Sequence, residues 1–67
     1  MVTEEKKQAY LAKVYKEMNR RNIFGDDIHR VISKTGFMKA LNEYPEEQLH
    51  YSVSDAVDEI LVIAAKA

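Results

Sequence analysis

The sequence predicts an all-α protein, a small helical bundle formed by a single domain over residues 1–67. Apolar residues recur at helical spacing through most of the chain, and no stretch of useful length alternates between apolar and polar residues as a half-buried strand would. The two glycines and the one proline fall between the helical segments. We therefore expect two long terminal helices, at about 4–22 and 46–66, bridged by one or two short helices at about 27–35 and 37–43.

The first helix is predicted between Thr3 and about Asn22. Its larger apolar residues follow the spacing i, i+1, i+4, i+5, i+8 and so form one stripe: Tyr10, Leu11, Val14, Tyr15 and Met18. Thr3 is a suitable N-cap, and Glu4 and Glu5 lie where the helix dipole favours negative charge. The segment is therefore predicted to be an amphipathic helix with a well-marked beginning.

Glycines delimit the short bridging helices. Gly25 can adopt the left-handed conformation that ends a helix, after which Asp26 or Asp27 can cap the second helix. That second helix stops at Gly36, which we expect to be the left-handed residue of a Schellman turn. The next segment, at about 37–43, is too short to be stable alone but apolar enough to pack against the others.

The last helix has the strongest periodicity. Pro45 suits the first turn of a helix, and the apolar residues beyond it closely follow the spacing i, i+4, i+7, i+8, i+11, i+12: Leu49, Val53, Ala56, Val57, Ile60, Leu61, Ile63 and Ala64. Because this stripe passes through Ser52 without a change of phase, we favour one long helix over 46–66. In the alternative, Ser52 and Asp55 form a capping box that opens a shorter helix at Val53.

Chain length makes self-association an expected property. Hydrophobic residues are 46% of the sequence and charged residues 31%, a composition typical of a folded globular protein. In a chain of 67 residues the hydrophobic gain and the entropic cost of folding nearly balance, and the absence of cysteine excludes disulfide and thiolate-zinc cross-links. Association with another subunit is the remaining common source of stability for so small a core.

Catalytic, cofactor and metal chemistry find little support in the sequence. There is no phosphate-cradling glycine loop, no nucleophile motif, and no room within one small core for a substrate pocket, so we expect neither an enzyme nor a bound cofactor. Glu47 and His50 form an E-x-x-H pair of the kind that di-iron bundles use on two helices, but one copy is insufficient, so no metal site is expected.

The cellular location is predicted from the first residues of the sequence, from its apolar runs and from the absence of cysteine. The segment Met1 to Lys6 lacks the basic and apolar regions of a signal peptide, and the longest apolar run is far shorter than a membrane span. We therefore expect a cytoplasmic protein with no membrane partner.

Charge is distributed unevenly although the net charge is only −1. Residues 1–22 hold six basic and three acidic residues, whereas residues 23–67 hold four basic and eight acidic ones. On the first helix a basic face lies opposite the apolar stripe: Lys6, Lys13, Lys16 and Arg20. A solvated face partly paired with the acidic last helix explains this pattern, and a phosphate-tracking surface for nucleic acid is the functional alternative.

The polar side of the predicted last helix contains an anomaly. Its residues at i, i+4, i+7, i+11 are Tyr51, Asp55, Asp58 and Val62, so an aromatic and a β-branched residue lie where a monomer would expose them to water. Either Val62 is an isolated exposed residue or is covered by the bridging helices, or this face is an association surface.

These observations predict a protein-protein interaction module with an accessory or regulatory role, homodimeric through its C-terminal helix. Tyr51, Asp55, Asp58 and Val62 are the predicted interface residues. The alternative is a nucleic-acid-binding regulator that uses Lys6, Lys13, Lys16 and Arg20 on the first helix.

Overall fold

The computed structural model describes residues 3–66, which form five helices joined by short turns. The helices are α1 (Glu4–Arg20), α2 (Asp26–Ser33), α3 (Phe37–Glu43), α4 (Pro45–His50) and α5 (Val53–Lys66). No residue within 3–66 belongs to a strand, so the predicted all-α class, with long first and last helices bridged by short ones, is confirmed.

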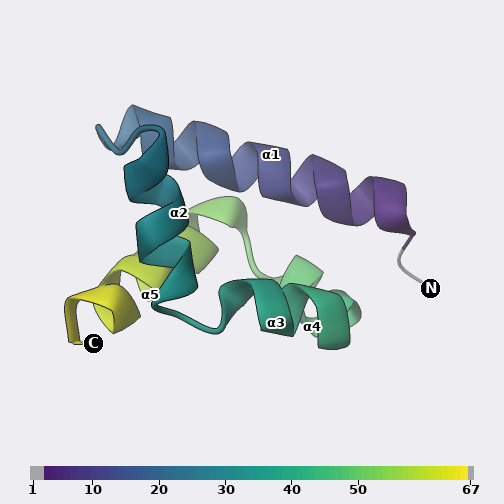
Figure 1. Ribbon diagram of the computed structural model, residues 1–67. Helices are drawn as coiled ribbons and strands as arrows, with labels where there is room; N and C mark the ends of the chain where they lie inside the picture. The colour runs from purple at the N-terminus through teal and green to yellow at the C-terminus, as the bar shows by residue number, and fades with distance from the viewer. Residues whose placement is uncertain (1–2, 67) are drawn as a thin grey trace.

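Helix α1 extends along one side of the molecule, and the other four helices lie beneath it (Figure 1). It contacts α4 and α5, while α2 contacts α3 and α5, and α3 also contacts α4. In Figure 1, α2 descends from the C-terminal end of α1, and α3 and α4 lie under its N-terminal half. Each short helix therefore packs against at least two other helices, which supply the stability that its length alone does not give.

The prediction of one helix over 46–66 is wrong, because the chain leaves helical geometry at Tyr51 and Ser52. Tyr51 is extended, with φ −76° and ψ 139°. The Ser52 hydroxyl accepts a hydrogen bond from the backbone N–H of Asp55 at 3.1 Å, which caps α5 as in the alternative interpretation. Periodicity did not reveal the break because Leu49 and Val53 pack against the core from either side of it.

The extended backbone at Tyr51 is tied to the middle of α1. The Tyr10 hydroxyl donates a hydrogen bond to the Tyr51 carbonyl at 3.1 Å. Burial raises the pKa of Tyr10, so the hydroxyl stays protonated as a donor well above neutral pH. A carbonyl freed by the end of α4 is thereby satisfied within the protein.

The first helix ends earlier than predicted, and the left-handed residue that ends it is Asn22 rather than Gly25. It stops at Arg20 rather than near residue 22, and Asn22 takes the left-handed conformation with φ 68°. The Ile23 N–H then donates to the Met18 carbonyl at 2.9 Å, the hydrogen bond that defines a Schellman motif. Gly25, predicted to end this helix, instead precedes α2 with φ 56° and ψ −127°.

Neither aspartate caps α2, and the turn that follows it is made by a threonine. Asp26 and Asp27 lie in the first turn of α2 instead of at its N-cap. The buried Thr35 hydroxyl donates to the Ile32 carbonyl at 2.9 Å and accepts from the Phe37 N–H at 3.2 Å. Gly36 has φ −87°, so the Schellman turn predicted there is absent.

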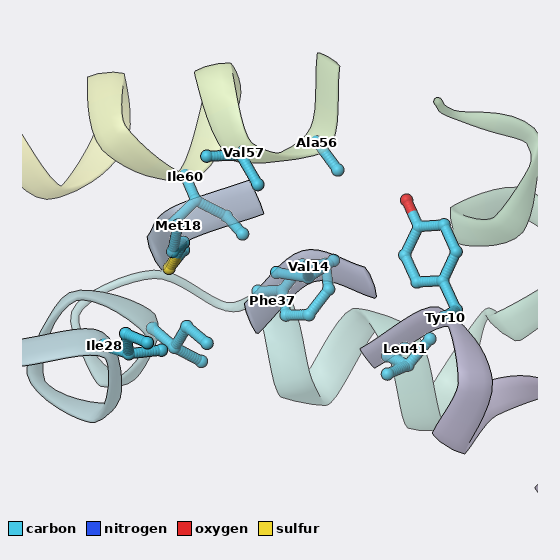
Figure 2. Close-up of a cluster of buried hydrophobic side chains, with 10 residues drawn as sticks. Tyr10, Val14, Met18, Ile28, Phe37, Leu41, Ala56, Val57 and Ile60 are labelled. Carbon is cyan, nitrogen blue, oxygen red and sulfur yellow. The ribbon is translucent and has the colours of Figure 1, made fainter. Parts of the chain in front are cut away.

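The core is formed by the facing sides of α1, α2, α3 and α5 (Figure 2). Within the described residues, α4 contributes no fully buried side chain and only covers the edge of the cluster. Val14 of α1 and Val57 of α5 have no accessible surface, and the two helices contact each other directly. The buried apolar residues are Tyr10, Val14, Met18, Ile28, Ile32, Phe37, Leu41, Ala56, Val57 and Ile60.

The two glycines give a matched test of this backbone. Gly25→Ala should lower the free energy of unfolding by about 1–3 kcal/mol, because its positive φ is strained for any residue with a Cβ. Gly36→Ala, at negative φ and with open space around the added Cβ, should be neutral or stabilising by about 0.4–1 kcal/mol. Urea unfolding followed by circular dichroism measures both, and equal effects at the two positions would contradict the backbone described here.

Candidate interaction surfaces

The outer face of α5 exposes two adjacent branched aliphatic side chains. Val62 is 53% exposed and Ile63 is 41% exposed, although Ile60 on the inner face is buried. Exposed Glu59 and Lys66 flank this pair. Together the four residues follow i, i+3, i+4, i+7 and share one side of the helix; we call Glu59, Val62, Ile63 and Lys66 the α5 stripe.

An open groove of about 250 Å³ adjoins the α5 stripe. Ile63 and Glu59 belong to the stripe and also line the groove, so the two features are continuous. The groove reaches the turn between α2 and α3 and the side of α4; its other lining residues are Thr35, Gly36, Phe37, Ala40, Gln48 and Ile60. The exposed apolar surface therefore extends beyond α5 onto the base of α3.

The four residues predicted as an interface do not share one helix face. Asp55, Asp58 and Val62 are exposed on α5, whereas Tyr51 lies outside the helices because of the break before Ser52. The sequence analysis assigned Ile63 to the apolar stripe of the last helix and so did not predict its exposure. The spacing of Ile63 relative to charged residues three or four positions away was the signal that could have found it.

Arg21 joins the end of α1 to α5 through an ion-pair network. Its guanidinium donates to Asp58 Oδ1 at 2.5 Å, to Glu17 Oε2 at 2.8 Å and to the Ser54 hydroxyl at 3.2 Å. Arg20 donates to the same Glu17 carboxylate at 2.7 and 3.0 Å. Hydrogen bonds from Arg20 and Arg21 lower the pKa of Glu17 to about 2, against a smaller opposing effect of desolvation.

The Arg21 network involves one residue of the predicted interface, Asp58, and one residue of the predicted basic face, Arg20. Asp58 is engaged by Arg21 and Arg20 by Glu17, so each charge is already partly neutralised within the protein. The lysines of the predicted basic face are exposed and form no ion pair with any of residues 3–66: Lys6, Lys13 and Lys16.

A second groove, of about 340 Å³, lies between α1 and the link from α4 to α5. Lys6 and Lys13 line it from α1, and Tyr51, which is 52% exposed, lines it from the link. The remaining lining residues are Ala9, Tyr10, Leu49, Ser52 and Val53. The structure thus brings together two residues of the predicted nucleic-acid surface and one of the predicted interface.

The described residues include no cluster of side chains suited to a metal ion. No group of three or more His, Cys, Asp or Glu within residues 3–66 could hold a metal ion, and Glu47 and His50 are exposed on α4. Every buried polar side-chain atom in that range has a hydrogen-bond partner. Among the same residues, no helix combines the length and the apolar character needed to cross a membrane.

Comparison of the chain with protein-family models, with curated proteins and with solved structures finds no match in any of the three. The surfaces of the protein are therefore interpreted from their geometry and charge.

The Glu17 network predicts a specific dependence of stability on pH. Because the pKa of Glu17 is about 2 in the folded protein and near its ordinary value of 4.5 when unfolded, its contribution is present above pH 4.5 and is lost as the pH falls toward 2. Thermal unfolding at pH 5 and pH 3 should therefore show a larger decrease of Tm in the wild type than in Glu17→Gln. Glu5→Gln, which removes an exposed carboxylate without an ion pair to the described residues, should keep the wild-type decrease. An unchanged decrease in Glu17→Gln would contradict the network.

Proposed function

We propose that this is a small cytoplasmic protein-protein interaction module that forms a homodimer through the outer face of α5 and acts as an accessory or regulatory component. The observation that carries the proposal is the exposure of Val62 and Ile63 side by side on a helix whose other face is buried in the core. Covering the exposed part of each side chain would contribute roughly 1 kcal/mol, and a dimer would cover four of them.

A stable dimer interface needs more area than the α5 stripe supplies, so we include the groove beside the stripe in the proposed interface. A stable interface buries about 800 Å² per partner, which is about one sixth of the 4719 Å² accessible on this chain. The stripe covers only about two turns of one helix, too little to supply that area. The adjoining groove lined by Phe37, Ala40 and Ile63 supplies further apolar surface next to it.

Two aspartate substitutions on α5 test the proposal. Val62→Asp should leave the helix content unchanged and shift the dimer toward monomer, because a charge is placed in the interface. Ile60→Asp should unfold the chain, because Ile60 is 3% exposed and the new charge would be buried without a partner. Circular dichroism reports folding, and sedimentation equilibrium reports mass.

Ala65→Asp is the matched control, since it adds the same charge to an exposed position on α5 outside the stripe and should keep the dimer. A wild-type protein that is monomeric at high micromolar concentration would overturn the proposal. Identical behaviour of Val62→Asp and Ile60→Asp would show that the faces of α5 are wrongly assigned.

A second function, nucleic-acid binding, is favoured by the groove that joins Lys6 and Lys13 to Tyr51. Sites for single-stranded nucleic acid combine positive charge along the backbone path with aromatic rings on which bases stack. The two lysines are seven residues apart, or roughly 10 Å along the helix axis, and Tyr51, which is 52% exposed, lines the opposite wall of the groove. Engagement of Arg20 by Glu17 limits the predicted basic face, so this function ranks second.

Fluorescence anisotropy with labelled single-stranded and duplex oligonucleotides tests this alternative. Binding by the groove should favour the single strand and weaken steeply with salt, and Lys6→Gln with Lys13→Gln should reduce the salt slope by about 1.4. Tyr51→Ala should weaken binding by about tenfold or more through the loss of stacking. Lys34→Gln with Lys39→Gln removes two exposed lysines of α2–α3 and should have little effect. No binding at low salt would exclude the function.

A further inference from the structure

The α5 stripe is arranged symmetrically about its own centre. Its order along the helix is Glu59, Val62, Ile63, Lys66, so an acid and a base lie at equal distances from the midpoint between the two aliphatic residues. In a homodimer with two-fold symmetry the same patch faces itself, and a residue i that contacts j is matched by j contacting i. Antiparallel packing about this midpoint sets Val62 against Ile63 of the second copy and Glu59 against its Lys66.

We propose that a second copy of this chain docks on the α5 stripe in this antiparallel register. The inference rests on the homodimer proposed above and specifies its contact. The apolar pair then occupies the centre, where water is excluded, and the two ion pairs lie at its rim. This is the usual distribution of apolar and charged residues in a specific interface.

The charges select this register over a parallel one. In a parallel pair, Glu59 and Lys66 of one copy would each lie beside the same residue of the second copy. Like charges placed side by side oppose association. In the antiparallel pair every charge on the stripe meets its opposite. Glu59 and Lys66 form no ion pair inside residues 3–66, so both are available to the second copy.

The surroundings of the stripe leave room for the partner helix. Ile63 also lines the groove against α3, so the Val62 side chain of the second copy, placed opposite Ile63, meets the edge of that groove. On the other side of α5, Asp58 is held by Arg21 and does not compete with Glu59 for Lys66 of the partner. The groove and the Arg21 network thus flank the stripe without blocking it.

Charge reversal at both ends of the stripe tests the register. Glu59→Lys and Lys66→Glu each replace two attractive pairs per dimer with two repulsive ones, so each should raise the dimer dissociation constant about 10- to 50-fold, with a smaller effect at high salt. Combining both substitutions in one chain reverses the ion pairs and should restore the wild-type constant to within a few-fold. Sedimentation equilibrium measures the constants, and circular dichroism confirms that every variant is folded.

Mixing the two single variants gives an independent readout. One chain then carries only lysines at 59 and 66 and the other only glutamates, so both ion pairs form across a mixed dimer. Native mass spectrometry of the mixture should show the heterodimer in excess over either homodimer. Glu43→Lys and Lys39→Glu, which reverse exposed charges on α3, form the matched control pair and should show no such preference.

The outcomes separate the register from the dimer itself. Weakened single variants, a rescued double variant and a preferred heterodimer support the proposal. A dimer that forms normally in the wild type and in both single variants overturns this register and leaves the homodimer in place. A monomeric wild type overturns both.

Discussion

The interruption of the helix at Tyr51 and Ser52 is the constraint on which the arrangement of the other elements depends. A continuous helix from Pro45 to Lys66 would be a rod about 33 Å long, longer than α1 itself. Such a rod could not place its first part against α3 and its second part against both α1 and α2. The break allows α4 to close one end of the molecule while α5 fills the centre, and Ser52 and the Tyr10 hydroxyl satisfy the backbone groups that it frees.

Long amphipathic segments could be predicted from the sequence because capping and periodicity agreed there. Thr3 caps α1 as expected, accepting from the Lys6 N–H at 3.2 Å, and Val57 and Ile60 are buried on the predicted face of α5. The turns could not be predicted equally well. Several residues can make the same turn, and the choice of Asn22 over Gly25 depends on where Ile23 reaches the core rather than on conformational preference.

The candidate sites could be predicted only in part because they depend on the angles between helices. Exposure of Val62 follows from the period of α5, so it was found from the sequence. The presence of Lys6 and Tyr51 in one groove depends on the angle at which α4 and its link approach α1, and periodicity contains no information about that angle. Thr35 was missed for a similar reason, since its role comes from two backbone groups that only the turn brings together.

The homodimer proposed on the exposed Val62 and Ile63 would also link the amount of this protein to its survival. In such a dimer, association and folding would be coupled by mass action, and each subunit would gain stability from the other as their concentration rises. A dilute population would spend more time unfolded and open to proteolysis, whereas an abundant one would protect itself. If the proposed dimer forms, the half-life of the protein should therefore increase with its level of expression.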